Sequence, residues 1–145
     1  MRTMDPIPTL DDSKALGRRI GYGIAVGINL VMVWVVYNVL EWGWPPFITE
    51  DWTRVRGVVA MSMIVAIIVN AAFILFDPRW FRGIGEAISG FASLIASLRV
   101  FSVYPFDFSP YAGPWDFLAK FILVVAIVGT VIGIVTNLGK AIRAL

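Results

Sequence analysis

Three long runs of this sequence contain no charged residue, and this feature limits the folds open to the chain more than any other. They cover residues 20–40, 57–76 and 121–139 and consist mostly of apolar side chains. A helix rises 1.5 Å per residue, so about 20 residues cross the roughly 30 Å hydrocarbon layer of a bilayer. Each run therefore predicts one membrane-spanning helix.

A fourth segment, residues 84–104, is a weaker candidate because it carries two charges, Glu86 near its start and Arg99 nearer its end. Both lie within reach of an interface, and the long Arg99 side chain can extend toward the headgroups. We expect this segment to span the membrane, with an interfacial or re-entrant helix as the alternative. Loops 41–56 and 105–115 are both rich in aromatic residues and proline, and this match favours four spans over three.

The expected fold is an all-α membrane protein whose four transmembrane helices form a compact bundle of two helical hairpins with short loops. The helices are expected at about 20–41, 57–76, 84–104 and 116–139, after a polar tail at 1–19. The composition agrees, with 59% hydrophobic and 15% charged residues. Soluble domains average about 45–50% apolar and about 25% charged residues.

The distribution of Lys and Arg predicts the orientation, because cytoplasmic segments carry the excess of positive charge. Eight lie in the tail, in the connector after the second helix and at the C-terminus: Arg2, Lys14, Arg18, Arg19, Arg79, Arg82, Lys140 and Arg143. Arg54 and Arg56 lie on the other side, and counting Arg99 and Lys120 there weakens the ratio to eight against four. We expect a multi-pass protein of the cell membrane with both termini in the cytoplasm.

The residue types present exclude several classes of function. The chain has no Cys and no His, which excludes disulfides, Cys/His zinc sites, His-ligated haem and a His general base. No cofactor or metal is expected. The net charge is +2 and the basic residues form no stripe, so nucleic acid is not an expected partner. No nucleophile is visibly paired with a base, so we expect a non-enzymatic protein rather than an enzyme acting on lipids.

Polar side chains inside the apolar segments are the candidate functional residues, because lipid offers them no hydrogen-bond partner. Glu86, Ser89 and Ser93 share one small and polar face of the third helix, which we expect to be buried or to line a wet cavity. Asn29 and Asn70 are each expected to find a partner. Contacts between helices are the simpler interpretation of these residues, and an ion or substrate site is the alternative.

The two charges of the third helix are too far apart along the helix axis to pair with each other. We expect each to meet an opposite charge at its own interface, with a proton or ion role as the alternative. The candidate partners are Arg18, Arg19, Arg79, Arg82 and Lys140 for Glu86, and Glu41, Asp107 and Asp116 for Arg99.

The fourth helix carries the pattern most typical of close helix packing. Gly129 and Gly133 form a small-residue motif, and Thr130 lies on the same face. Helices in lipid associate through small residues that allow close approach. Packing within the chain's own bundle is the simpler interpretation of this face, and homodimerisation is the alternative.

Together these features predict a non-enzymatic packing or accessory component of a homo-oligomer or a larger membrane complex, surrounded by the lipid bilayer. The alternative is a small oligomeric channel or proton-coupled transporter that uses the polar face of the third helix. A water-accessible cavity that reaches both Glu86 and Ser93 would favour this alternative.

Overall fold

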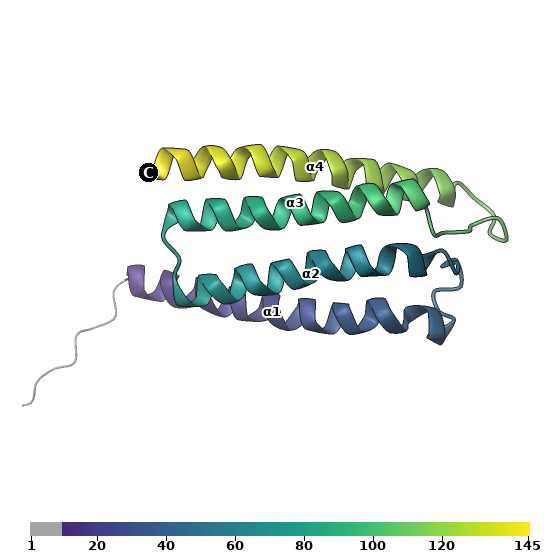
Figure 1. Ribbon diagram of the computed structural model, residues 1–145, viewed down its shortest axis with the longest axis horizontal. Helices are drawn as coiled ribbons and strands as arrows, with labels where there is room; N and C mark the ends of the chain where they lie inside the picture. Colours follow the sequence, from purple (N-terminus) through teal and green to yellow (C-terminus); the bar gives the residue numbers. More distant parts are fainter. Residues whose placement is uncertain (1–9) are drawn as a thin grey trace, which may run out of the picture.

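The computed structural model describes residues 10–145, which form four α-helices (Figure 1). They are α1 (Leu10–Trp42), α2 (Trp52–Leu75), α3 (Arg79–Val103) and α4 (Trp115–Ala144). All four are long and apolar enough to cross a membrane, including α3 with its two charges. The all-α fold class and the number of helices are therefore confirmed. The predicted tail before Leu10 lies outside the described residues.

The helices extend beyond the apolar runs that predict them. α1 takes in Lys14, Arg18 and Arg19, and α4 continues past Lys140 and Arg143. Lys and Arg are good helix formers, so a helix continues where the chain leaves the hydrocarbon. The apolar runs thus predict the part of each helix that crosses the membrane and underestimate its full length.

The four helices pack as an open row in the order of the sequence (Figure 1). α1 contacts α2, α2 contacts α3, and α3 contacts α4, whereas no contact joins α1 to α3 or α4 within residues 10–145. The expected bundle of two hairpins is therefore present, and α2 and α3 are the helices through which the hairpins pack. α1 and α4 are edge helices with one neighbour each.

Small residues on the inner helix α3 let its neighbours α2 and α4 approach closely. A Cβ atom added at Gly83 would lie 2.8 Å from the Asn137 carbonyl oxygen and 2.8 Å from the Ala141 Cβ, both on α4. One added at Gly90 would lie 2.8 Å from Ile134 Cγ1. The buried residues of α3 are Gly83, Gly85, Ala87, Ala92, Ala96 and Val100. Close approach through small residues is the packing expected of helices in lipid.

An aromatic cluster joins the first three helices. The Phe73 side chain on α2 is buried, and its ring centroid lies 5.2 Å from that of Tyr22 on α1 and 5.9 Å from that of Phe81 on α3. A Cβ atom at Gly85 would lie 2.6 Å from the Phe73 ring, so this glycine makes room for it. At the same end of the row, Arg18 Nε donates to Asp77 Oδ2 at 3.1 Å.

The two aromatic loops meet at the opposite end of the row. Ile48 and Phe106 form a single antiparallel bridge, with the Thr49 amide donating to the Pro105 carbonyl oxygen at 2.9 Å. The Asp107 amide donates to the Phe47 carbonyl oxygen at 2.8 Å. These backbone bonds tie the α1–α2 hairpin to the α3–α4 hairpin at a place where α1 and α4 do not meet.

The outer surface of the row fits lipid. Only 6% to 28% of the residues in the most apolar window of each helix are buried inside the protein. The exposed side chains include Val31, Trp34, Ile68, Phe91, Ile95, Val125 and Ile132. Soluble monomers rarely expose apolar patches of this extent. The protein is therefore a small membrane protein by the chemistry of its surface as well as by the length of its helices.

Candidate functional site

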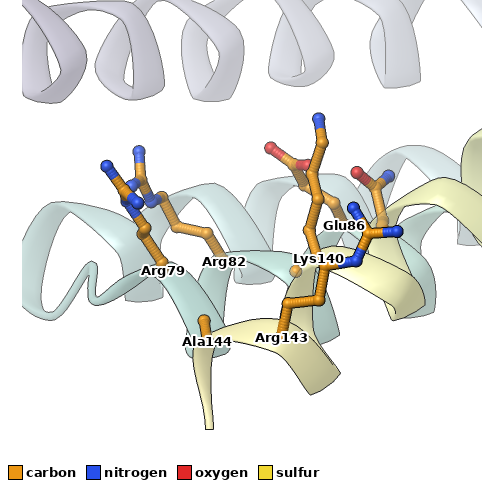
Figure 2. Close-up of a pocket in the computed structure, with 8 residues that line it drawn as sticks. Arg79, Arg82, Glu86, Lys140, Arg143 and Ala144 are labelled. Atoms are coloured by element: carbon orange, nitrogen blue, oxygen red, sulfur yellow. The ribbon is translucent and has the colours of Figure 1, made fainter.

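A pocket of about 490 Å³ opens between the first turns of α3 and the last turns of α4 (Figure 2). It is lined by Arg79, Arg82, Gly83, Glu86, Asn137, Lys140, Arg143 and Ala144. In Figure 2 the charged side chains rise from the same side of the two helices. The lining thus combines four cationic side chains with one carboxylate.

The local sequence explains why these side chains gather. Pro78 precedes α3, and a proline at that position favours a helix start because its missing N–H costs nothing there. Arg79, Arg82 and Glu86 then follow at helical spacing and share one face. α3 and α4 form an antiparallel hairpin, which places Lys140 at the end of α4 beside the start of α3.

The positive charge of the pocket is not neutralised by ion pairs. Within residues 10–145 none of its charged side chains has an opposite charge within 4.0 Å, and the ion pairs of the protein lie elsewhere. Arg82 Nε is buried and donates no hydrogen bond to any described residue. A buried donor without an acceptor costs roughly 1–3 kcal/mol. The pocket is therefore chemically suited to a negatively charged group.

Glu86 lies where three of its expected partners also lie. Arg79, Arg82 and Lys140 line the same pocket, although none of them approaches the Glu86 carboxylate to ion-pair distance in the described residues. Arg18, another expected partner, binds Asp77 instead. Glu86 is exposed at the rim of the protein rather than held in an ion pair.

Arg99 lies at the other end of α3 and is exposed. The expected pairing with Glu41, Asp107 or Asp116 is not seen, and Asp116 instead binds Lys120 at 3.1 Å. Of the two charges that the sequence analysis singled out within the third helix, Glu86 lines the pocket and Arg99 does not.

Ser89 and Ser93 are half-buried on α3, as the helical spacing predicts, and the large residues Phe91 and Ile95 are exposed on the other side. Neither serine lines the pocket, which reaches Glu86 and stops before the next turn of the helix. This pocket therefore does not extend along the polar face to the two serines.

Asn29 and Asn70 each bond to their own helix. The Asn29 amide donates to the Ala25 carbonyl oxygen at 2.8 Å, and the Asn70 amide donates to that of Ala66 at 2.7 Å. Each bond reaches back one turn, so the expected partner is the local backbone rather than a second helix. Both side chains are half-buried, and neither lines the pocket.

The Gly129 and Gly133 motif is not in close contact with another helix of the described chain. No described atom lies within 4 Å of a Cβ added at either glycine. Thr130 is half-buried, and its hydroxyl donates to the Ala126 carbonyl oxygen at 2.6 Å. α4 meets α3 through the buried Ile134 and Ala141 instead. The simpler interpretation, packing of this motif within the chain's own bundle, is therefore wrong for residues 10–145, and homodimerisation stays a prediction.

A second polar cluster, not foreseen from the sequence, lies at the loop end. The Tyr104 hydroxyl donates to the Asp116 backbone oxygen at 3.3 Å, and the Lys120 ammonium lies 5.0 Å from the Tyr104 ring centroid. Burial raises the pKa of Tyr104 to about 12, with Asp116 adding to the rise. The hydroxyl therefore stays protonated near neutral pH and anchors the end of α3 to the start of α4.

No protein family, curated protein or solved structure matches this chain. The pocket itself was not predicted from the sequence, although Arg79, Arg82, Lys140 and Arg143 predict the orientation and the first three are also candidate partners of Glu86. The helical spacing of Arg79, Arg82 and Glu86 was the signal that pointed to a shared face.

Proposed function

We propose that this protein is a non-enzymatic component of a membrane assembly and works by associating laterally with further copies of itself. The observation that carries the proposal is the position of Gly129 and Gly133 on the open side of the edge helix α4.

The open face of α4 has the properties of a helix–helix interface. Its two glycines allow a second helix to approach, and the exposed Val125 and Ile132 on the same helix offer apolar contact. The hydroxyls of Thr130 and Thr136 bond within α4, so a partner need not satisfy them.

A second copy of the chain is the occupant that this face fits best. A two-fold axis would bring the same glycine face of two α4 helices together, and such isologous contacts are the commonest in homo-oligomers. Since α4 has only one neighbour within the described chain, forming the contact requires no change in the row. The protein would then bury glycines that are open in the single chain.

Gly129→Ile is expected to weaken self-association by about tenfold, because the added side chain fills the space that a second helix would occupy. The purified full chain would be followed by analytical ultracentrifugation in detergent over a range of protein-to-detergent ratios. Gly27→Ile is the matched control, since Gly27 is an equally open glycine on the other edge helix. A wild-type chain that stays monomeric at every ratio, or an equal loss with Gly27→Ile, would contradict the proposal.

We also propose that both termini face the cytoplasm. The start of α1, the α2–α3 connector and the C-terminus lie at one end of the row, and the cations of the pocket lie there too (Figure 1). The aromatic loops lie at the other end. The excess of Lys and Arg at the first end supports a cytoplasmic position for it.

Labelling of single cysteines tests this orientation, and the cysteine-free chain needs no prior substitution. In intact cells, Ala112→Cys is expected to react with a membrane-impermeant maleimide, because Ala112 is exposed in the loop between α3 and α4. Ser13→Cys and Leu145→Cys are expected to react only after the cells are permeabilised. The reverse pattern would show that the chain has the opposite orientation.

A further inference from the structure

We propose that the pocket between the start of α3 and the end of α4 binds the phosphate group of an anionic ligand. Arg79, Arg82, Lys140 and Arg143 bring four positive charges to its lining, and Glu86 brings the one negative charge. Within residues 10–145 no ion pair removes any of these charges. Like charges held together without counter-charges raise the affinity of a site for an anion.

The donors in the pocket suit a phosphate in particular. A guanidinium presents its N–H groups in a planar fork that matches the oxygens of phosphate, and Lys adds a point charge. Figure 2 shows Arg79 and Arg82 rising side by side from α3, with Lys140 reaching the same side from α4.

The helix termini and the size of the pocket also favour binding of a ligand that carries a phosphate group. The first turn of α3 contributes to the lining, and the positive end of a helix dipole favours an anion. The negative end of the α4 dipole opposes it, but Lys140 and Arg143 lie there and offset that field. A volume of about 490 Å³ also leaves room for more than the phosphate itself.

The position of the pocket along the helices favours a lipid as the source of the phosphate. The uncharged run of α4 ends at Gly139, directly before Lys140, and that of α3 begins after Glu86. The charged lining therefore lies just beyond the hydrocarbon, at the depth of lipid headgroups. Basic pockets between helices on the cytoplasmic side are suited to anionic headgroups.

Removing the charge of Glu86 is expected to change the affinity for the anionic ligand in the opposite direction from removing a cation of the pocket. As the only acid in the lining, its carboxylate repels an anionic ligand and opposes binding. Glu86→Gln removes that repulsion and is expected to tighten binding by about fivefold, whereas Arg82→Gln and Lys140→Gln are each expected to weaken it by about fivefold. A purely structural role of these residues would not produce changes in both directions.

Binding would be measured on the full chain in neutral detergent by native mass spectrometry. The probes are short-chain phosphatidylglycerol and short-chain phosphatidylcholine at equal concentration, with inorganic phosphate as competitor. Arg99→Gln is the matched control, because it removes the same charge from an exposed position at the other end of α3. We expect phosphatidylglycerol to bind more tightly than phosphatidylcholine, and Arg99→Gln to leave its dissociation constant unchanged.

The possible outcomes distinguish a lipid headgroup from a soluble phosphate as the ligand, and some of them would overturn the proposal. Binding of phosphatidylglycerol that resists millimolar phosphate identifies a lipid headgroup, whereas displacement by phosphate with the same order of variants identifies a soluble phosphate ligand. An equal loss with Arg99→Gln, or weaker binding with Glu86→Gln, would overturn the proposal. If Arg82→Gln fails to fold, Lys140→Gln and Glu86→Gln decide the question, since both side chains are exposed. Phosphatidylglycerol should still bind to the Gly129→Ile variant, which is expected to be monomeric. A failure of lipid binding can therefore be told apart from a failure of self-association.

Discussion

Phe73→Ala is expected to lower the free energy of unfolding by about 3 kcal/mol, the low end of the range for removing a buried phenylalanine. The Phe73 side chain is 2% exposed and contacts groups on α1 and α3, so its loss leaves a cavity where three helices meet. The value lies at the low end because lipid tails are as apolar as the protein interior. The cost then comes mainly from lost van der Waals contacts rather than from exposure to water.

The measurement is a titration of the folded protein in mixed micelles with sodium dodecyl sulfate, followed by circular dichroism. Phe117→Ala is the matched control, because it makes the same change on α4 at a side chain that is 70% exposed. We expect the control to unfold at the same detergent fraction as the wild type. Equal stability of Phe73→Ala and Phe117→Ala would show that the aromatic cluster does not hold α1, α2 and α3 together.

The positions of the helices were predictable from the sequence because each depends on a local property. An uncharged run of about 20 residues has few alternatives to a spanning helix, since lipid leaves no other way to satisfy the backbone. Pro45, Pro46 and Pro105 mark where the helices end for a reason that is equally local. The pairing of loops 41–56 and 105–115 at one end then follows from an even number of crossings.

The choice of packing faces was not predictable from the sequence in the same way. Gly129 and Gly133 form the clearest small-residue motif in the chain, yet Gly83, Gly85 and Gly90 of α3 make the close contacts. A helix face made of small residues indicates that another helix can approach closely, but it does not identify that helix. In an open row an inner helix such as α3 has a neighbour on each side, so the order of the helices decides which small residues make close contacts.

The pocket could not be predicted either, because the sequence alone does not show which helices are neighbours. Arg79 and Arg82 lie far from Lys140 in the sequence, and each group alone resembles the charges that flank any spanning helix. Only the α3–α4 hairpin brings them together around Glu86. From the sequence, Glu86 is expected to pair with a cation at its own interface, and its polar face with Ser89 and Ser93 is the candidate for a wet cavity. The structure places Glu86 among three of the expected cations but, within residues 10–145, in no ion pair and in a pocket that neither serine lines.

Gly83→Leu is expected to destabilise the protein by about 3 kcal/mol, the upper part of the range for overpacking. A Cβ atom at this position would already lie 2.8 Å from the Asn137 carbonyl oxygen and 3.0 Å from the Ala141 amide nitrogen. Both are backbone atoms of α4, so a change of side-chain rotamer cannot relieve the clash. The start of α3 and the end of α4 would have to separate.

The same titration in mixed micelles measures this loss. Gly27→Leu is the control, because no described atom lies within 4 Å of a Cβ at Gly27. Its stability is expected to stay the same or to rise by up to about 1 kcal/mol, since glycine is a poor helix former. If the Gly83→Leu variant were as stable as the Gly27→Leu variant, α4 would not lie against α3 at this point. Because Gly83 also lines the basic pocket, a real separation of the helices should weaken phosphatidylglycerol binding together with stability.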